Sequence, residues 1–412
     1  MRVLLVSQEM PPETAWGGIG TYADVLSEAL VAKGHQVDVL SLVEGQQRST
    51  ARRNGVTIHR FRLPRVHGPG RLAPETWRRL WLAFGAARLA GRLCVRPDVI
   101  ECPEWNAEGL ALAVAGRAPL VVRLHSAARQ LFPHTGQGRS LRGLDGRWAA
   151  GLEETSARLA QVVVSTRGNL AEMSDVVGLD RDAVHAIPYP VRLPEPSLLR
   201  AEGPPTVTFV GRLESRKGPE VLLRAAPQVL AEVPETRFVF VGRDGTAPGA
   251  PSSAAWLRRE AQRLGIAQAI EFPGQLGRAE LAAELARSTV CAFPSRWESF
   301  GNVVAEASAT GRPVVVSAIP PFHELVEDGV TGHVVATEGE REWAAALIAV
   351  LGDRDRSRAM GEAGAARVAS ISAPGRVASL ALTAYDHAIE RWGMGARAGR
   401  GHPGRRANGL VR

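Results

Sequence analysis

Two glutamates, Glu298 and Glu306, stand eight residues apart on either side of an expected helix start in the segment Arg296–Glu306. The first amides of a helix have no partner inside the helix, so they form a ready site for an anion. A phosphate group held there would leave the two carboxylates to accept hydroxyl groups on either side. The amides concerned are those of Ser299, Phe300, Gly301 and Asn302. The pattern predicts a cradle for a sugar nucleotide.

A second group of charges lies in the segment Gly211–Gly218, which directly follows an apolar run and precedes an expected helix. Arg212 and Lys217 are spaced so that one turn brings both cations to a single phosphate, the guanidinium as a planar fork and the ammonium as a point charge. The alternative is a solvated basic loop. Lysine usage favours the phosphate site, because the chain has only two lysines, Lys33 and Lys217, against 48 arginines.

The segments around these motifs alternate between short apolar runs and helix-like stretches in both halves of the chain. Apolar runs joined by helical crossovers are typical of a parallel sheet that is buried on both faces. The expected strands are residues 3–6, 37–40, 56–59, 98–100, 120–124, 162–164, 207–210, 238–241, 270–272, 290–293 and 314–316, and the expected helices include residues 22–33, 107–115, 219–231, 254–264, 279–286 and 303–310. The fold class predicted is α/β, with two doubly wound, Rossmann-like domains that face each other across a cleft.

A proline-rich stretch separates the two halves. Prolines at positions 188, 190, 194, 196, 204 and 205 disfavour both a helix and an inner strand. We expect an acceptor-side N-terminal domain over residues 1–190, a linker over 191–205, a nucleotide-sugar-binding C-terminal domain over 206–372, a crossover helix over 373–391 that packs back on the N-terminal domain, and a disordered basic tail over 392–412.

Composition places the chain among soluble globular proteins and argues against specific nucleic-acid binding. Its 412 residues are 45% hydrophobic and 22% charged, which suffices for two cores. Six arginines from Arg391 onward account for six of the eight net positive charges, so the body is nearly neutral. No run is apolar enough to span a bilayer, and the first residues fit a strand, so we expect a cytoplasmic protein. The basic tail leaves open a peripheral contact with anionic lipid at the inner membrane face.

Three strings in the second half form a specific series. They are G-R-L-x-x-x-K-G, F-P-S-x-x-E-S-F-G-x-x-x-x-E-A and G-x-P-V-V-x-S, all between Val207 and Val335. The first half adds the loop G-G-x-x-x-Y-A, a strand that ends in R-L-H-S at His125, and V-V-V-S-T-R before the linker. Over most of its length the chain resembles glycosyltransferase family 4, whose members are retaining enzymes of the GT-B fold.

The resemblance implies a role for each matching residue. Arg212 and Lys217 would bind the diphosphate of the donor, helped by the amides after Glu298 and by Gly17 and Gly18 of the N-terminal glycine loop. Glu306 would accept hydrogen bonds from the ribose, and Glu298 from the hydroxyls of the donor sugar. His125 would reach the transferred sugar from the opposite domain, although a lone histidine at the end of a strand is more often structural. The implied reaction takes a nucleoside diphosphate sugar as donor, needs no cofactor or metal, and uses a hydroxyl acceptor that is a glycan, a lipid or a small molecule.

Other motifs give weaker indications of function. The segment Gly17–Ala23 also fits a dinucleotide fingerprint, but a long loop separates it from the first strand, which disfavours hydride transfer. Asp180–Asp182 and Asp353–Asp355 resemble metal-binding D-x-D pairs, yet both stand at expected helix boundaries, where Asp is a common cap. Glu101 and Glu104 follow an expected strand, and the sequence leaves open whether they contact substrate or cap the next helix. The three cysteines, at 94, 102 and 291, show neither metal-ligand nor disulfide spacing.

Rival functions on the same scaffold are a nucleotide-sugar epimerase, a phosphorylase and a non-catalytic nucleotide-sugar binding protein. The sequence does not identify the base, the donor sugar, the acceptor or the oligomeric state. Base selectivity is expected near Arg243 and residues 274–276. Acceptor choice is expected in two arginine-containing loops, residues 65–74 and 129–147, which suggest an anionic or lipid-phosphate acceptor.

Overall fold

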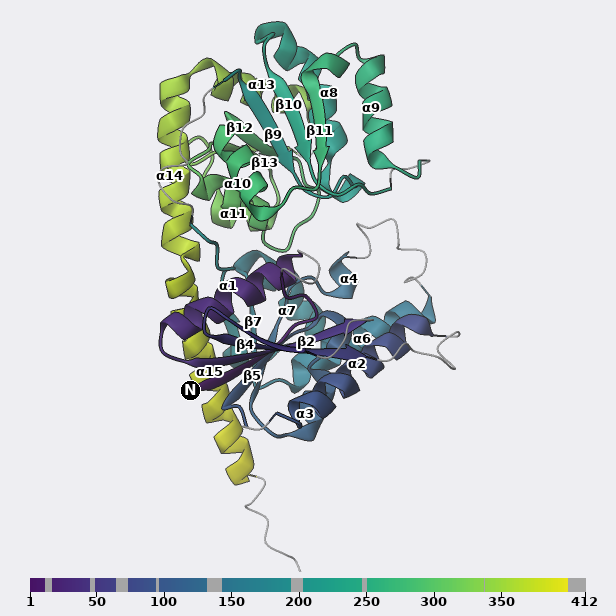
Figure 1. Ribbon diagram of the computed structural model, residues 1–412, viewed down its shortest axis with the longest axis vertical. Helices are drawn as coiled ribbons and strands as arrows, with labels where there is room; N and C mark the ends of the chain where they lie inside the picture. Colours follow the sequence, from purple (N-terminus) through teal and green to yellow (C-terminus); the bar gives the residue numbers. More distant parts are fainter. Residues whose placement is uncertain are drawn as a thin grey trace, which may run out of the picture.

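The computed structural model describes residues 1–11, 17–44, 49–63, 73–93, 96–131, 143–193, 203–246, 250–336 and 338–398. Several expectations fall outside these residues: those on Cys94, most of the proline-rich linker, most of the two acceptor loops, and the end of the basic tail from residue 399. Two α/β domains stand one above the other in Figure 1, and the last helix runs down one side of the lower domain. The predicted pair of parallel-sheet domains is confirmed.

The N-terminal sheet has the strand order β3-β4-β2-β1-β5-β6-β7-β8, and all pairs are parallel except β3 with β4. Its strands are β1 Arg2–Val6, β2 Gln36–Glu44, β3 Ser49–Arg53, β4 Val56–Leu63, β5 Val99–Pro103, β6 Leu120–Arg123, β7 Val162–Ser165 and β8 Val184–Ala186. Helices described in this domain are α1 Gly18–Ala32, α2 Pro74–Ala90, α3 Leu110–Ala115, α4 Ala128–Leu131, α6 Leu144–Leu159 and α7 Arg167–Val177.

The C-terminal sheet is fully parallel, with the order β11-β10-β9-β12-β13-β14. Its strands are β9 Thr206–Val210, β10 Arg237–Val241, β11 Ile270–Gly274, β12 Val290–Phe293, β13 Val314–Ser317 and β14 His333–Val335. The helices described after β9 are α8 Pro219–Glu232, α9 Ser253–Arg263, α10 Arg278–Arg287, α11 Asn302–Ala309, α12 Pro320–Leu325, α13 Glu340–Gly352, α14 Arg354–Ser372 and α15 Pro374–Ala398.

Alternating side chains of each strand fill separate cores on the two faces of its sheet. In β1, Val3 packs with α1 and α15, whereas Leu4 packs on the opposite side with α2 and α3. In β9, Val207 and Phe209 pack with α8 and α13, and Val210 lies on the other face. Because both faces are covered, the strands are almost continuously apolar, which is why the sequence pattern predicted them.

Helix α15 returns to the N-terminal domain, as predicted. It packs on α1 and on strands β5, β6 and β7, and its Tyr385 hydroxyl donates to Glu101 in β5 at 2.5 Å. The chain crosses between the domains twice, and the two crossings lie side by side. The Val191 N–H of the first crossing donates to the Ser372 carbonyl oxygen of the second at 2.9 Å. The helix continues to Ala398, beyond the boundary expected at Arg391.

Four further elements differ from the sequence expectation. Helix α1 begins at Gly18 rather than Tyr22, so the expected glycine loop is the first turn of a helix. Helix α2 begins at the end of the first expected acceptor loop, and helix α6 begins inside the second. Strand β3 escaped prediction because it is a polar edge strand, mostly exposed, with no apolar run to mark it.

Strand order also locates the place where a ligand can bind. In each sheet the order reverses at one point, between β1 and β5 in the N-terminal domain and between β9 and β12 in the C-terminal domain. Crossover helices leave in opposite directions from such a pair, which opens a crevice at the carboxyl ends of the strands. The segments Gly211–Gly218 and Pro294–Gly301 follow β9 and β12, so both predicted motifs lie at this point.

Candidate functional site

The two motif loops of the C-terminal domain are locked against each other. Gly218 has φ of 66°, and a Cβ atom on it would lie 2.1 Å from the carbonyl oxygen of Pro294. The Arg296 N–H donates to the carbonyl oxygen of Arg216 at 2.8 Å. Glycine at position 218 therefore lets the short 3₁₀ turn Ser215–Lys217 press onto the loop after β12.

This packing brings Lys217 against Glu298, which is buried. The Lys217 ammonium donates to Oε1 of Glu298, and the Ser295 hydroxyl donates to the same oxygen at 3.2 Å. Arg216 stands on the other side, with its guanidinium 3.5 Å from Oε2 of Glu298. The three charged side chains form a compact cluster at the carboxyl edge of the sheet.

Burial and charge act in opposite directions within this cluster. Burial alone would raise the pKa of Glu298, but the charges of Lys217 and Arg216 outweigh it and keep that pKa below its ordinary value. Burial lowers the pKa of Lys217, and the carboxylate of Glu298 only partly offsets the effect. Glu214 pairs with Arg216 at 2.7 Å and lies 3.5 Å from Arg212. These contacts therefore bring together three cations and two carboxylates, and the surplus cation favours a further negative charge.

Arg212 does not contact Lys217 in this structure, and that both bind one phosphate stays a prediction. Its side chain is exposed and lies 3.5 Å from Glu214, not against Lys217. The cation that shares Glu298 with Lys217 is Arg216, which is buried and donates to the Trp297 carbonyl oxygen at 3.0 Å. Sequence reasoning missed Arg216, although the residue lies in the motif itself. Sequence patterns indicate burial through apolar side chains, so a buried arginine gives no signal of this kind.

Helix α11 begins within one residue of the position expected from the sequence, and its first amides are those of Asn302 and Val303 instead of the four predicted from Ser299 to Asn302. Gly301 is the N-cap, with φ of 98°, and the helix begins at Asn302. The Val304 N–H donates to Gly301 O at 2.9 Å, so the amides of Asn302 and Val303 precede the first helical hydrogen bond. Oδ1 of Asn302 is buried and has no hydrogen-bond partner among the described residues.

Ser299 and Phe300 lie ahead of this helix and join the two domains instead of extending it. The Thr166 hydroxyl of the N-terminal domain donates to Ser299 O at 2.9 Å, and the Ser126 and Ser299 hydroxyls are 3.4 Å apart. The Phe300 ring stacks on Tyr189 with centroids 5.0 Å apart and planes 12° apart. The sequence analysis did not predict a role for Tyr189, because this residue lies among the prolines before the linker and belongs to no motif.

The first turn of helix α1 faces the first turn of helix α11 from the other domain. A Cβ atom on Gly18 would lie 3.2 Å from Nδ2 of Asn302. The α1 amides already have an anion: the Gly20 N–H donates to Oε2 of Glu9 at 3.2 Å, and a Cβ on Gly17 would lie 2.1 Å from that oxygen. Burial raises the pKa of Glu9, against the lowering effect of these amides and of Arg212. A phosphate that approaches Gly18 must therefore displace Glu9 or meet it protonated.

His125 enters the same region from the N-terminal domain and is buried. Its backbone N–H donates to the Glu104 carboxylate at 2.8 Å, and its Nδ1 is hydrogen-bonded to the Tyr189 hydroxyl. Burial, together with the positive charge of Arg123, holds the pKa of His125 well below its ordinary value. The imidazole is therefore neutral at pH 7 and lines a small cavity of about 10 Å³ with Tyr22 and Glu101.

Glu101 and Glu104 are buried, and the side chain of Glu104, at the N-cap position, makes no capping hydrogen bond to the next helical turn. Glu101 is buried inside β5 and accepts hydrogen bonds from the hydroxyls of Tyr22 and Tyr385. Glu104 accepts from the backbone of His125 and Ser126, so it shapes the loop that carries the histidine. Burial raises the pKa of Glu104 to about 8. The capping alternative is therefore wrong, and the contact of Glu101 and Glu104 with substrate stays a prediction.

Glu306 lies on α11, one turn beyond the helix start, and is partly buried. Burial raises its pKa to about 7, while the nearby charge of Arg278 acts in the opposite direction. Arg278 donates to Asp24 of helix α1 at 3.1 Å, which gives another contact between the domains. Glu306 is therefore close to half ionised near neutral pH.

The D-x-D pairs are helix caps, as their positions indicated. Asp180 accepts from the Asp182 N–H at 3.1 Å, and Asp353 accepts from the Arg356 N–H at 3.0 Å. Within the described residues there is no group of three or more His, Cys, Asp or Glu side chains suited to a metal ion. Cys102 and Cys291 are buried free thiols. In the part of the chain that the structure describes, no helix is both long and apolar enough to cross a membrane.

Comparisons with known proteins bear on the family and the fold of the chain. A family model described as glycosyl transferases group 1 matches residues 195–367, and a glycosyl transferase 4-like domain model matches residues 17–190. The chain is 30% identical over 375 residues to the glycogen synthase of Mycobacterium tuberculosis (strain CDC 1551 / Oshkosh), covering 86% of each protein. Its fold is similar to sucrose-phosphate synthase from Thermosynechococcus elongatus, with TM-score 0.75, 20% identity, and coverage of 94% and 99% of the two chains. It is also similar to Anabaena HepE in complex with UDP-glucose, with TM-score 0.68, 20% identity, and coverage of 93% and 99%.

Proposed function

This chain belongs to the glycosyl transferases of group 1 and is a glycosyltransferase that takes its sugar from a nucleotide sugar, and we propose that it passes this sugar to an acceptor hydroxyl with retained configuration. The observation that carries the proposal is the buried cluster of Lys217, Arg216 and Glu298, which stands at the strand-order reversal beside the start of α11. Together with Arg212 and Glu214, the cluster has one cation more than carboxylates, and this positive charge suits a diphosphate. Retention is inferred from the resemblance to family 4.

The barrier in this reaction is departure of an anionic phosphate from a carbon that becomes oxocarbenium-like. Lys217 and the amides of Asn302 and Val303 are fixed before the reaction begins, so they stabilise the charge on the leaving phosphate without reorganisation. Arg212, whose side chain is exposed, is proposed to bind the same diphosphate from the solvent side. The cations then do the electrostatic work that a metal does in other enzymes.

Glu298 is proposed to orient the donor sugar rather than to attack it. Its Oε1 is shared by Lys217 and Ser295, and hydrogen bonds of this kind make a carboxylate a poorer nucleophile. Buried His125, neutral at pH 7, is proposed to hydrogen-bond a hydroxyl of the transferred sugar. We therefore propose that the acceptor attacks on the face from which the phosphate leaves and that the phosphate oxygen takes the acceptor proton. Trapping of a covalent glycosyl-enzyme would contradict this mechanism.

Product analysis tests the function against its rivals. Thermal-shift measurements with UDP-glucose, ADP-glucose and GDP-mannose first identify the donor, because a ligand that binds only the folded state raises the melting temperature further as its concentration exceeds its dissociation constant. The identified donor is then incubated with and without a panel of glycans, lipids and polyols. We expect nucleoside diphosphate release only with an acceptor, and an anomer of unchanged configuration by NMR. Conversion of the sugar nucleotide without acceptor would indicate an epimerase, and binding without turnover would indicate a binding protein.

Glu306 gives a prediction for pH. If its ionised carboxylate accepts the two ribose hydroxyls, binding favours the deprotonated form, so affinity should rise with pH until the group is fully ionised in the free protein. With a pKa of about 7, the affinity for the sugar nucleotide should increase from about pH 6 and level off by about pH 8. Calorimetry with an intact sugar nucleotide measures this cleanly, because its pyrophosphate does not titrate in that window.

The matched variant is Glu306→Gln, which keeps the shape and one acceptor oxygen but cannot ionise. It should bind more weakly at pH 8 and show no rise between pH 6 and 8. A wild-type affinity that is flat with pH, or the same slope in both proteins, would refute the ribose role of Glu306 and leave the diphosphate site untouched.

A further inference from the structure

Helix α2 turns an aromatic face toward solvent. Trp77, Trp81 and Phe84 follow at helical spacing and are 42%, 39% and 66% exposed. The opposite face of the same helix holds Leu82 and Leu89, both buried in the core of the N-terminal domain. Amphipathic helices on soluble domains usually present polar side chains to water, so three large aromatic groups on the outer face need an explanation.

Helix α6 continues this face. Its Leu144 and Trp148 are 65% and 58% exposed, and Leu159 at the far end is also exposed. The two helices start side by side, because the Asp145 carboxylate of α6 accepts the Thr76 N–H of α2 at 2.9 Å. They also pack along their lengths. We call the exposed side chains of both helices, namely Pro74, Trp77, Trp81, Phe84, Arg88, Leu144, Arg147, Trp148, Arg158 and Leu159, the α2/α6 surface.

Every charge on the α2/α6 surface is positive. Its cations are Arg88, Arg147 and Arg158, and no carboxylate of these two helices belongs to it. The acidic residues of both helices are already paired: Asp145 accepts from amides of α2, Glu153 pairs with Arg79 at 2.8 Å, Glu154 pairs with Arg129 at 2.6 Å and with Arg158 of the surface at 3.4 Å, and Glu75 pairs with Arg79 at 2.8 Å. The segregation leaves a surface of aromatic, aliphatic and guanidinium groups only.

We propose that the α2/α6 surface docks on an anionic lipid bilayer. Tryptophan and phenylalanine side chains insert at the boundary between headgroups and acyl chains, and arginines beside them are attracted to anionic headgroups. A second copy of the chain fits less well, because a two-fold contact would place the arginines of one copy against those of the other. The surface lies on the described helices and does not depend on the basic tail.

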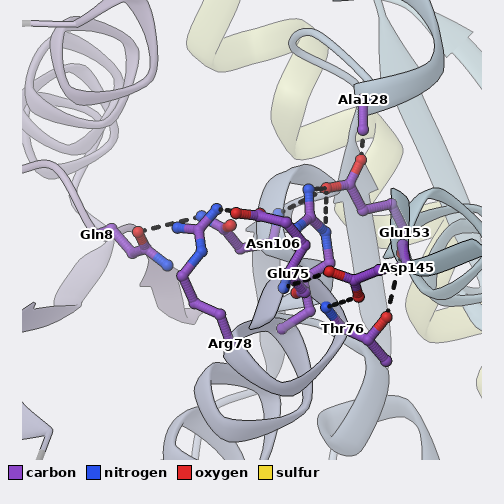
Figure 2. Close-up of polar contacts among 9 residues, drawn as sticks. Gln8, Glu75, Thr76, Arg78, Asn106, Ala128, Asp145 and Glu153 are labelled. Atoms are coloured by element: carbon purple, nitrogen blue, oxygen red, sulfur yellow. Dashed lines mark hydrogen bonds and ion pairs between the residues drawn. The ribbon is translucent and has the colours of Figure 1, made fainter. Parts of the chain in front are cut away.

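The inner side of the same two helices is tied to the reaction site. Glu153 of α6 accepts from the Ala128 N–H at 2.9 Å and the Asn106 N–H at 3.1 Å, and Ala128 stands three residues after His125. The Asn106 side chain in turn donates to Gln8 at 3.1 Å, just beyond β1. Figure 2 shows this network of polar contacts, from Glu75 and Thr76 of α2 through Glu153 to Gln8 and Ala128. The helices that meet the bilayer thus also hold the loops on the acceptor side of the crevice.

Vesicle co-sedimentation of the full chain tests the proposal. The probes are vesicles of phosphatidylcholine alone and of phosphatidylcholine mixed with phosphatidylglycerol. The chain should sediment with the anionic vesicles, bind the neutral ones more weakly, and lose affinity as salt screens the arginines. The variant Trp77→Gln/Trp81→Gln/Phe84→Gln should lose about tenfold or more of the affinity for anionic vesicles, since each aromatic side chain contributes through its buried apolar area.

The matched control replaces apolar side chains that are equally exposed but lie elsewhere, Val330→Gln and Met394→Gln, and it should bind as the wild type does. All variants keep the basic tail, so a triple variant that binds anionic vesicles unchanged would assign binding to the tail and overturn the proposal. Light scattering that shows a wild-type dimer and a monomeric triple variant would overturn it in favour of self-association, as would a wild-type chain that ignores vesicles. Unchanged melting temperatures and donor-induced thermal shifts show that the variants are folded.

Discussion

Replacing Lys217 with methionine is expected to lower kcat by a factor of about 10² to 10³, equivalent to about 2.7 to 4 kcal/mol, if the ammonium acts as one preorganised donor to the leaving phosphate. Methionine keeps the length and apolar stem of lysine but removes the charge. The turn that carries the residue is fixed by Gly218 against Pro294, so the backbone should stay in place. The loss should appear in kcat more than in donor affinity, because charge on the phosphate grows toward the transition state.

The measurement is turnover at saturating donor, with donor affinity determined separately by calorimetry. A matched control is Arg237→Met, which removes a cation from the same domain in an exposed pair with Glu271 at 3.1 Å and should leave turnover unchanged. Removing Lys217 also leaves Glu298 with Arg216 as its remaining cation, so a melting curve must accompany the kinetics. A folded Lys217→Met protein with near wild-type kcat would contradict the proposed role.

Replacing Glu101 with leucine is expected to destabilise the fold by about 3 to 5 kcal/mol, the typical cost of removing one member of a buried charge network. Glu101 accepts the hydroxyls of Tyr22 at 2.7 Å and Tyr385 at 2.5 Å, and it lies near the buried guanidinium of Arg123. Leucine would leave both hydroxyls without this acceptor and remove the carboxylate charge that faces Arg123. Since Tyr385 belongs to α15, the change should also loosen the attachment of that helix.

The free energies of unfolding of Glu101→Leu and Tyr385→Phe, measured with denaturant, separate the contribution of the whole carboxylate from that of one hydrogen bond to it. The second variant removes a single hydrogen bond to the same carboxylate and should cost about 1 kcal/mol. Limited proteolysis should cut within α15 faster in Glu101→Leu than in the wild type. Equal unfolding free energies for the two variants would show that the carboxylate contributes no more than one hydrogen bond, contrary to the network that the structure shows.

The sequence predicted the architecture well because the features that define strands and helices lie within each segment of the chain. A strand buried on both faces, such as Val207–Val210, must be apolar throughout, and the helices between such strands must carry one apolar face. The motif loops could be placed at the carboxyl edge because each followed its strand directly. Predictions failed where that local mark was missing, as in the polar strand β3 and in helices α2 and α6, whose outer faces carry apolar instead of polar side chains.

Within the site, the sequence alone predicted Lys217 and Glu298 in the motif loops, Glu306 on the helix that follows, and His125 just after β6, and their contact with a ligand stays a prediction. It could not decide how their charges pair. Arg212 and Arg216 both lie in the segment Gly211–Gly218, and the sequence does not show which of them pairs with Glu298. Only Arg216 is buried beside Glu298, because the turn at Gly218 presses that side of the loop onto Pro294. Likewise Glu9, Tyr189 and Glu104 act on the site through contacts across the fold. Such contacts depend on distances between residues far apart in the chain, and only tertiary packing sets those distances.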